Sequence, residues 1–183
     1  GSFSFKKAAA NFLLNDGTAL TQANYLEVGG HVSSAFAGVG GIGFTLSDVN
    51  FGAVMVSSGG ATPVNYMTLK ADVGSATLGG ISGLNATVTS LSVVVNKTSS
   101  LTAGAPVLDY VDTTANLNDN SATTRSIATG PSSPAVVLDV DGDEGALLKV
   151  QSNVTLDVFG FVTLAGSFSF KKAAANFLLN DGT

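Results

Sequence analysis

The chain has no cysteine and no tryptophan, and only 11% of its 183 residues are charged. Without cysteine it has no disulfide framework, no thiolate zinc site and no thiol nucleophile. Average soluble domains carry about 25% charged residues, so serine, threonine, asparagine and glycine must supply most of the polar surface. Eight basic and thirteen acidic residues give a formal net charge of −5. This balance argues against a nucleic-acid partner, because phosphate binding needs a basic surface.

The chain also has a single histidine, His31. A Ser-His-Asp triad needs a histidine held between a nucleophile and an acid, and no nucleophile-elbow sequence is present. Zinc needs three or four ligands from histidine, cysteine and carboxylates. We therefore expect His31 to be an exposed strand residue and the protein not to be an enzyme.

Two segments resemble functional motifs but have a simpler interpretation. Residues 38–43 satisfy the pattern G-x-G-x-x-G. A dinucleotide site needs a helix after these glycines, whereas an alternating strand pattern follows here, so we expect a structural role for them. Residues 73–96 contain no charge, yet their glycine, serine, threonine and asparagine content is too polar for a membrane-spanning helix. We expect no membrane span.

The last 18 residues, 166–183, are identical to the first 18, residues 1–18. The period is 165 residues, which predicts that residues 1–165 form one full tandem repeat and that residues 166–183 begin the next. We expect the chain to be an excerpt of a longer array; a duplicated tag is the alternative. Neighbouring copies of the same repeat are then its first expected partners.

A weaker repeat of about 41 residues lies inside the longer one. Asn24–Val28 reappears as Asn65–Leu69, and Leu147–Val150 begins a further copy. These matches predict four sub-units, of which the third is the most diverged. The sub-units are 25–65, 66–106, 107–146, and 147–165 continuing into 166–183.

Apolar residues alternate with polar ones along these sub-units, which is typical of half-buried strands. The alternation slips by one residue at the same place in three copies, for example between Leu46 and Val49 and between Val88 and Leu91. Such a slip predicts a β-bulge or a kink. Residues 6–14 and 171–179 are rich in alanine, lysine and leucine, which favour helix, but the repeat pattern favours strand. The predicted fold is all-β with little or no helix, either a solenoid-like stack or a long-stranded sandwich.

Seven of the thirteen acids lie between residues 109 and 144. The tightest group surrounds a glycine turn: Asp139, Asp141, Asp143 and Glu144. Carboxylates at alternate positions around a turn can converge on calcium, which takes six to eight oxygen ligands in flexible geometry. Neither the EF-hand spacing nor the nonapeptide calcium repeat is met. The sequence therefore allows two interpretations of this segment, a calcium site or an acidic turn exposed to solvent.

Long, nearly perfect repeats that lack cysteine, are poor in lysine and carry acidic turns resemble the repeat arrays of giant bacterial secreted or surface proteins. Large adhesins and RTX-like proteins are the nearest such class. The resemblance is one of repeat style and composition, so it assigns no binding residue. It implies an extracellular or cell-surface location, a spacer role and calcium-dependent rigidity.

Repeat arrays grow in one dimension because each unit buries its open face against the next. The expected function is therefore that of a structural repeat module, acting as an extender, stalk or adhesive scaffold. One alternative is a self-assembling fibre or sheath module whose edges pair with other chains. Another is a carbohydrate- or surface-binding module, with its site in residues 107–146.

Overall fold

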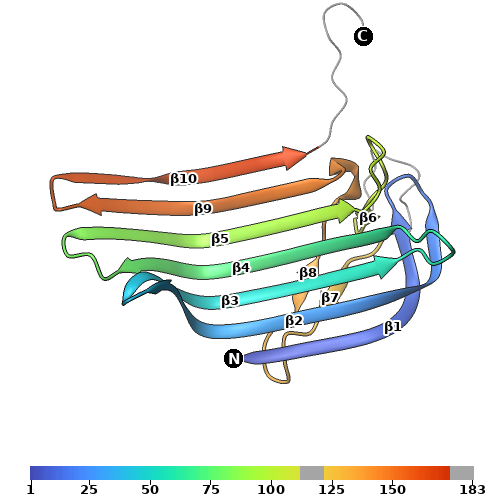
Figure 1. Cartoon of the computed structure of the whole chain (residues 1–183), viewed down its shortest axis with the longest axis horizontal. Coiled ribbons are helices and arrows are strands. Elements are labelled where there is room, and N and C mark those ends of the chain that lie inside the picture. The colour runs from blue at the N-terminus through green and yellow to red at the C-terminus, as the bar shows by residue number, and fades with distance from the viewer. Residues whose placement is uncertain (112–121, 174–183) are drawn as a thin grey trace, which may run out of the picture.

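The structure is a computed structural model that describes residues 1–111 and 122–173. Eight strands form one open antiparallel sheet in the order β10-β9-β5-β4-β3-β2-β1-β6 (Figure 1). A separate pair, β7 and β8, lies across one face of this sheet. The all-β prediction is confirmed.

Seven of the strands are 12 to 21 residues long, well above the usual five or six. They are β1 Ser2–Leu14, β2 Ala19–Val39, β3 Ile42–Ser57, β4 Asn65–Gly79, β5 Leu84–Thr98, β9 Leu147–Val158 and β10 Val162–Ala173. The other elements are short. They are β6 Leu108–Asp109, β7 Arg125–Ile127, β8 Val136–Leu138 and the 3-10 turn η1 Gly142–Glu144.

The long hairpins β2–β3, β4–β5 and β9–β10 fall largely within three of the four expected 41-residue sub-units, although β2 begins at Ala19, before residue 25. The glycines of the G-x-G-x-x-G pattern make the β2–β3 turn, where Gly40 and Gly41 have φ values of 61° and 82°. Positive φ at both central residues matches the twist of a two-residue hairpin, so the structural role expected for these glycines is confirmed. Residues 107–146 instead supply β6, β7, β8 and η1.

We call the face that carries β7 and β8 the inner face and the opposite one the outer face. The core lies on the inner face, where sheet residues such as Val54 and Val56 pack against Ile127 and Leu138. Gly29 allows this close approach, because a Cβ there would lie 2.1 Å from the Ala128 carbonyl oxygen. Further along the strands the inner face is polar.

The slip in the alternation marks a backbone irregularity in two strands. Ser90 has a φ of 52°, and one extra residue in β5 shifts its pairing with β9. Val88 pairs with Val154, and Val93 pairs with Val150. Because Val150 and Val154 are an even number of residues apart in β9, all four share the outer face. The bulge thus keeps the apolar residues on one face although the sequence pattern changes phase.

Asp48 occupies the corresponding position in β3, with a φ of 55°. The pairing of β3 with β2 and β4 shows no extra residue there. The predicted bulge is therefore confirmed at Ser90, and Asp48 has a local backbone kink.

The third copy of the slip has a different cause. Residues 6–14 form strand, as predicted, but the pairing of β1 with β2 runs without a break from Ser2 to Ala10. Phe3 and Phe5 lie on the outer face with 62% and 63% of their surface exposed, whereas Phe12 is buried on the inner face. The pattern slips here because the apolar residues change face, and not because of a bulge. Residues 174–179 of the second copy lie outside the described residues.

The positive φ at Ser90 provides a test of the bulge. A non-glycine residue pays about 1–2 kcal/mol in this conformation, and glycine pays less. We expect Ser90→Gly to raise the free energy of unfolding by up to about 1 kcal/mol in urea denaturation. Ser92→Gly is the matched control on the same strand, and it should lower stability by about 0.5–1 kcal/mol. Equal effects of the two substitutions would contradict the bulge.

Candidate functional site

The four acids of the predicted calcium turn lie between β8 and β9, and each has a different environment. Asp139 Oδ1 accepts a hydrogen bond from Lys70 Nζ at 2.8 Å. Asp141 caps η1, because its Oδ1 accepts from the Asp143 backbone N–H at 2.8 Å. Glu144 Oε2 lies 2.5 Å from Lys171 Nζ in β10. Two of the four acids therefore pair with lysines that are distant in the sequence.

Another acid of the cluster, Asp109, is buried at 4% exposure. Its Oδ1 accepts from the backbone N–H of Gly142 at 2.8 Å, which fastens η1 to β6. Asp112 and Asp119 lie outside the described residues. Across residues 1–111 and 122–173, no three acidic or histidine side chains are grouped so as to hold a metal ion. Calcium binding thus remains a prediction from the sequence.

Asp141→Asn separates the charge of Asp141 from its capping role, because asparagine caps a helix as well as aspartate does. If calcium binds at the turn, adding calcium should raise the melting temperature of the wild type and a chelator should reverse the gain. Asp141→Asn should lose that gain while its chelated form melts with the chelated wild type. Thermal melting of both chains measures this, and an unchanged wild-type midpoint would remove the calcium site.

A second charged cluster lies on the inner face, where β1, β2 and β7 meet. Glu27 is 8% exposed, and its Oε1 accepts from Arg125 Nε at 2.5 Å. Lys6 Nζ lies 3.7 Å from the other oxygen. The Arg125 guanidinium also stacks over the rings of Phe12 and Tyr25, at 4.9 and 4.4 Å from their centres. These contacts give a buried carboxylate the partners it needs.

Tyr110 lies in the same interior, at 3% exposure. Burial raises the pKa of Tyr110 to about 12, although Thr68 and Arg125 lower it in part. The phenol therefore stays neutral at physiological pH. Beside it, Thr68 Oγ1 donates to Asn96 Oδ1, and Asn96 Nδ2 donates to the Leu108 carbonyl oxygen. This polar network fastens β6 to the sheet, which is a structural role.

No pattern in the sequence indicates these inner-face clusters. Asn96 is fully buried, although the sequence shows it only as part of a common N-x-T triplet. The charge of Arg125 is visible in the sequence as the single basic residue among the acids of residues 109–144, but its partner Glu27 is 98 residues away. Neither spacing nor composition connects two residues at such a separation.

His31 lies in strand β2, as expected, but its side chain is only 24% exposed. Its Nδ1 lies 2.9 Å from Asn50 Oδ1 and 3.6 Å from Asp48 Oδ1. The expected exposure is therefore wrong, because two side chains of the neighbouring strand β3 lie against the ring. The contacts hold the imidazole beside Asp48, the residue of β3 with positive φ.

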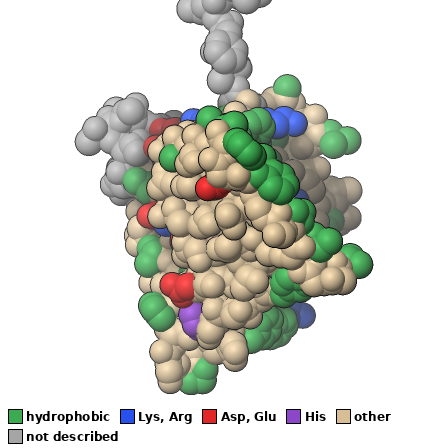
Figure 2. Space-filling view, turned by 90° about the vertical axis from the view of Figure 1, so that its left-hand side faces the viewer, with side chains coloured by type: hydrophobic (Ala, Val, Ile, Leu, Met, Phe, Trp, Pro, Cys, Tyr) green, Lys and Arg blue, Asp and Glu red, His purple; other side chains and the backbone are tan. Residues whose placement is uncertain are grey.

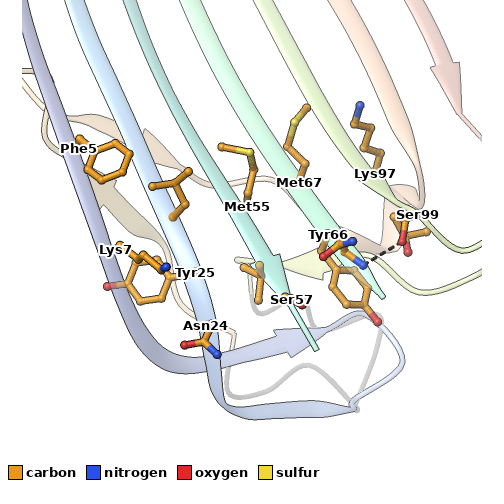
Figure 3. A pocket seen from close by; sticks show the side chains of 14 residues that line it. Phe5, Lys7, Asn24, Tyr25, Met55, Ser57, Tyr66, Met67, Lys97 and Ser99 are labelled. Carbon is orange, nitrogen blue, oxygen red and sulfur yellow. Dashed lines mark hydrogen bonds between the residues drawn. The ribbon is translucent and has the colours of Figure 1, made fainter. Parts of the chain in front are cut away.

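A groove of about 750 Å³ lies at one end of the outer face (Figure 3). One cross-strand row forms much of it: Lys7, Leu26, Met55, Met67 and Lys97. The apolar side chains lie between the two lysines, and the next row towards the strand ends is polar. The groove is therefore the boundary where the apolar outer face ends.

Comparison with known proteins finds no matching family model, no matching curated protein and no matching solved structure. Within the described ranges, the structure has no helix long and apolar enough to cross a membrane. The features of the molecule that bear on function are therefore the sheet itself, its two faces and its edges.

The Glu27 cluster gives a stability prediction. Arg125→Leu removes the closest partner of a buried carboxylate, which typically costs about 3–5 kcal/mol. We expect a loss near the lower end of that range in urea denaturation, since Lys6 still lies nearby. Lys70→Leu is the control, because its pair with half-exposed Asp139 should cost about 1 kcal/mol or less. Similar losses in the two variants would contradict a special role for the Glu27 cluster.

Proposed function

We propose that the chain is a structural repeat module of a giant extracellular or cell-surface protein, and that successive repeats join as one continuous antiparallel sheet. The module acts as an extender or stalk. The location follows from the resemblance to bacterial surface arrays, whereas the way the repeats join is argued from the sheet.

The observation that carries this proposal is the position of the two identical segments. Residues 1–8 lie in and just before β1, and residues 166–173 lie in β10. Six pairing steps separate the two strands: β1-β2-β3-β4-β5-β9-β10. Each step reverses direction in an antiparallel sheet, so β10 runs the same way as β1 (Figure 1). The two copies therefore run parallel, which is the direction that a continuous sheet of repeats needs.

The two copies also present the same face. A row of paired residues runs across the sheet from Phe3 in β1 to Phe170 in β10. Phe170 corresponds to Phe5 of the first copy, so the two copies are shifted along the strand by two residues. Because side chains alternate with a period of two, an even offset keeps the phenylalanines of both copies on the outer face. An odd offset would have turned the next repeat over.

The edge of β1 has room for a preceding repeat. β9 pairs with residues 166–173, so the same strand of a preceding copy would pair with residues 1–8. In the described structure, β6 pairs with β1 only at Leu13 and Leu14. A preceding β9 would therefore not displace β6.

The charges at the junction agree with this arrangement. Lys171 pairs with Glu144 beside β9, and Lys6, which is the same residue of the repeat, pairs with Glu27 of β2. In an array, one lysine would lie between the two acids. Glu144, which the sequence suggested as a calcium ligand, would then contribute to joining the repeats.

Of the alternatives, a fibre or sheath module uses the same free edges, but with strands from other chains. A carbohydrate site in residues 107–146 has less support, because Val107, Leu108, Ile127, Val136 and Leu138 of that segment are buried in the core.

The continuous sheet predicts how an array grows. Six strands at about 4.8 Å spacing add about 29 Å of sheet width per repeat. Chains with one, two and three copies of residues 1–165 should show this increment in the longest dimension from small-angle X-ray scattering. They should also unfold more cooperatively as copies are added. Scattering typical of flexibly linked beads, with unfolding independent of copy number, would contradict the proposal.

A further inference from the structure

The outer face of the sheet carries an unusually complete apolar surface. The three central strands β3, β4 and β5 have apolar residues at the outer-face positions between their hairpin turns and the row of Met55 and Met67. The exception is Gly74 of β4. The apolar residues are Phe44, Leu46, Val49, Phe51, Ala53, Met55, Met67, Leu69, Ala71, Val73, Ala76, Leu78, Ala86, Val88, Leu91, Val93 and Val95. Figure 2, which views the sheet from the hairpin tips, shows hydrophobic side chains gathered along one side.

The described chain does not cover this surface. β7 and β8 pack on the inner face, whereas Phe3, Phe5, Phe168 and Phe170 are 45–63% exposed. Twelve residues of strand span about 40 Å, and seven strands span about 29 Å, so the face measures about 1,200 Å². The largest apolar patch on an ordinary monomer is about 300–600 Å². A stable dimer buries about 800 Å² per partner, so the face is large enough for one.

The charges of the outer face are of one sign and lie at one end. By alternation and pairing, its only charged residues within the seven long strands are Lys7, Lys97 and Lys172. The carboxylates of these strands, including Glu27 and Asp72, belong to the inner face. Two copies stacked with their strands in the same direction would bring the lysine ends together. Stacking with opposite strand directions places them about a strand length apart.

We propose that two copies of this chain pack outer face to outer face, with their strands running in opposite directions. The sheets would lie about 10 Å apart, as in β-sandwiches. The two copies would be related by a two-fold axis that lies between the sheets, perpendicular to the strands and near their middle. Such a contact is self-complementary, because each copy offers the same apolar rows. A dimer through the outer face does not use the edges β1 and β10, where we propose that successive repeats join. The face-to-face dimer is therefore a separate proposal and does not depend on how the repeats join.

Adjacent residues of β5 provide a matched pair of variants. Val93 lies on the outer face, and Ser92 on the inner face. The wild type should have the mass of two copies in light scattering and sedimentation equilibrium. Val93→Glu should weaken the dimer at least 100-fold, because a carboxylate would be buried without a partner. Ser92→Glu should leave the dimer intact. Circular dichroism of both variants checks that the sheet still forms.

The cysteine-free chain allows a second test of the geometry. β4 is the fourth of the seven long strands, and Val73 lies near its middle on the outer face. Val73→Cys should place two thiols near the two-fold axis and form a disulfide-linked dimer under mild oxidation. Asp72→Cys, on the inner face, should remain unlinked. Equal cross-linking of the two variants would overturn the face-to-face arrangement.

The remaining outcomes separate the possible occupants of the face. A monomer that floats with phosphatidylglycerol vesicles, and loses this binding in Val93→Glu, would overturn the dimer in favour of a lipid surface. A monomer that binds neither would overturn it outright. If the dimer fails while tandem copies still add about 29 Å each, only the face-to-face inference is lost. If the dimer forms without that increment, the proposed extension is lost instead.

Discussion

Antiparallel pairing between neighbouring long strands is the constraint on which this structure depends. Most residues of one strand have a defined partner in the next, and pairing continues across the sheet from β1 to β10, with register shifts in the β1–β2 and β5–β9 pairs. Side-chain alternation then separates the sheet into two faces. The chain accommodates the register with tight glycine turns at the hairpin tips and a positive φ at Asp48 and Ser90. Without these residues, the apolar rows would not stay on one face.

Alternation is a local property. The sequence therefore predicted correctly the strands, including strand over helix for residues 6–14, and the backbone irregularities at Asp48 and Ser90. The cover of the inner face was not predictable in the same way. β7 and β8 are only three residues each, too short to show a period. The close packing of this segment on the sheet requires glycine at position 29. In the sequence, Gly29 is only one of 22 glycines. Its role becomes visible only when Ala128 is known to lie above it.

The environment of the acidic residues in the candidate site was likewise not predictable from the sequence. Counting along the chain groups Asp139, Asp141, Asp143 and Glu144, because they are neighbours in sequence. The fold distributes them by what lies opposite: a lysine of β4, a backbone N–H and a lysine of β10. A carboxylate paired with lysine is less available to a metal ion. Whether a cluster of acids binds a cation thus depends on the strands beside it as much as on its own spacing.

The distribution of charge also bears on how far the proposed assembly grows. Apart from the three lysines of the outer face, the residues that the structure describes carry ten acidic and five basic side chains, a net charge of −5. Two copies joined through their outer faces would cover the apolar surface and turn their acidic sides to solvent. Like charge on those sides opposes the addition of a third layer. The polar inner face, with serine and threonine along its distal half, offers no apolar area to offset that repulsion. Growth would then continue only along the edges, where β10 repeats β1, and the product would be a ribbon two sheets thick.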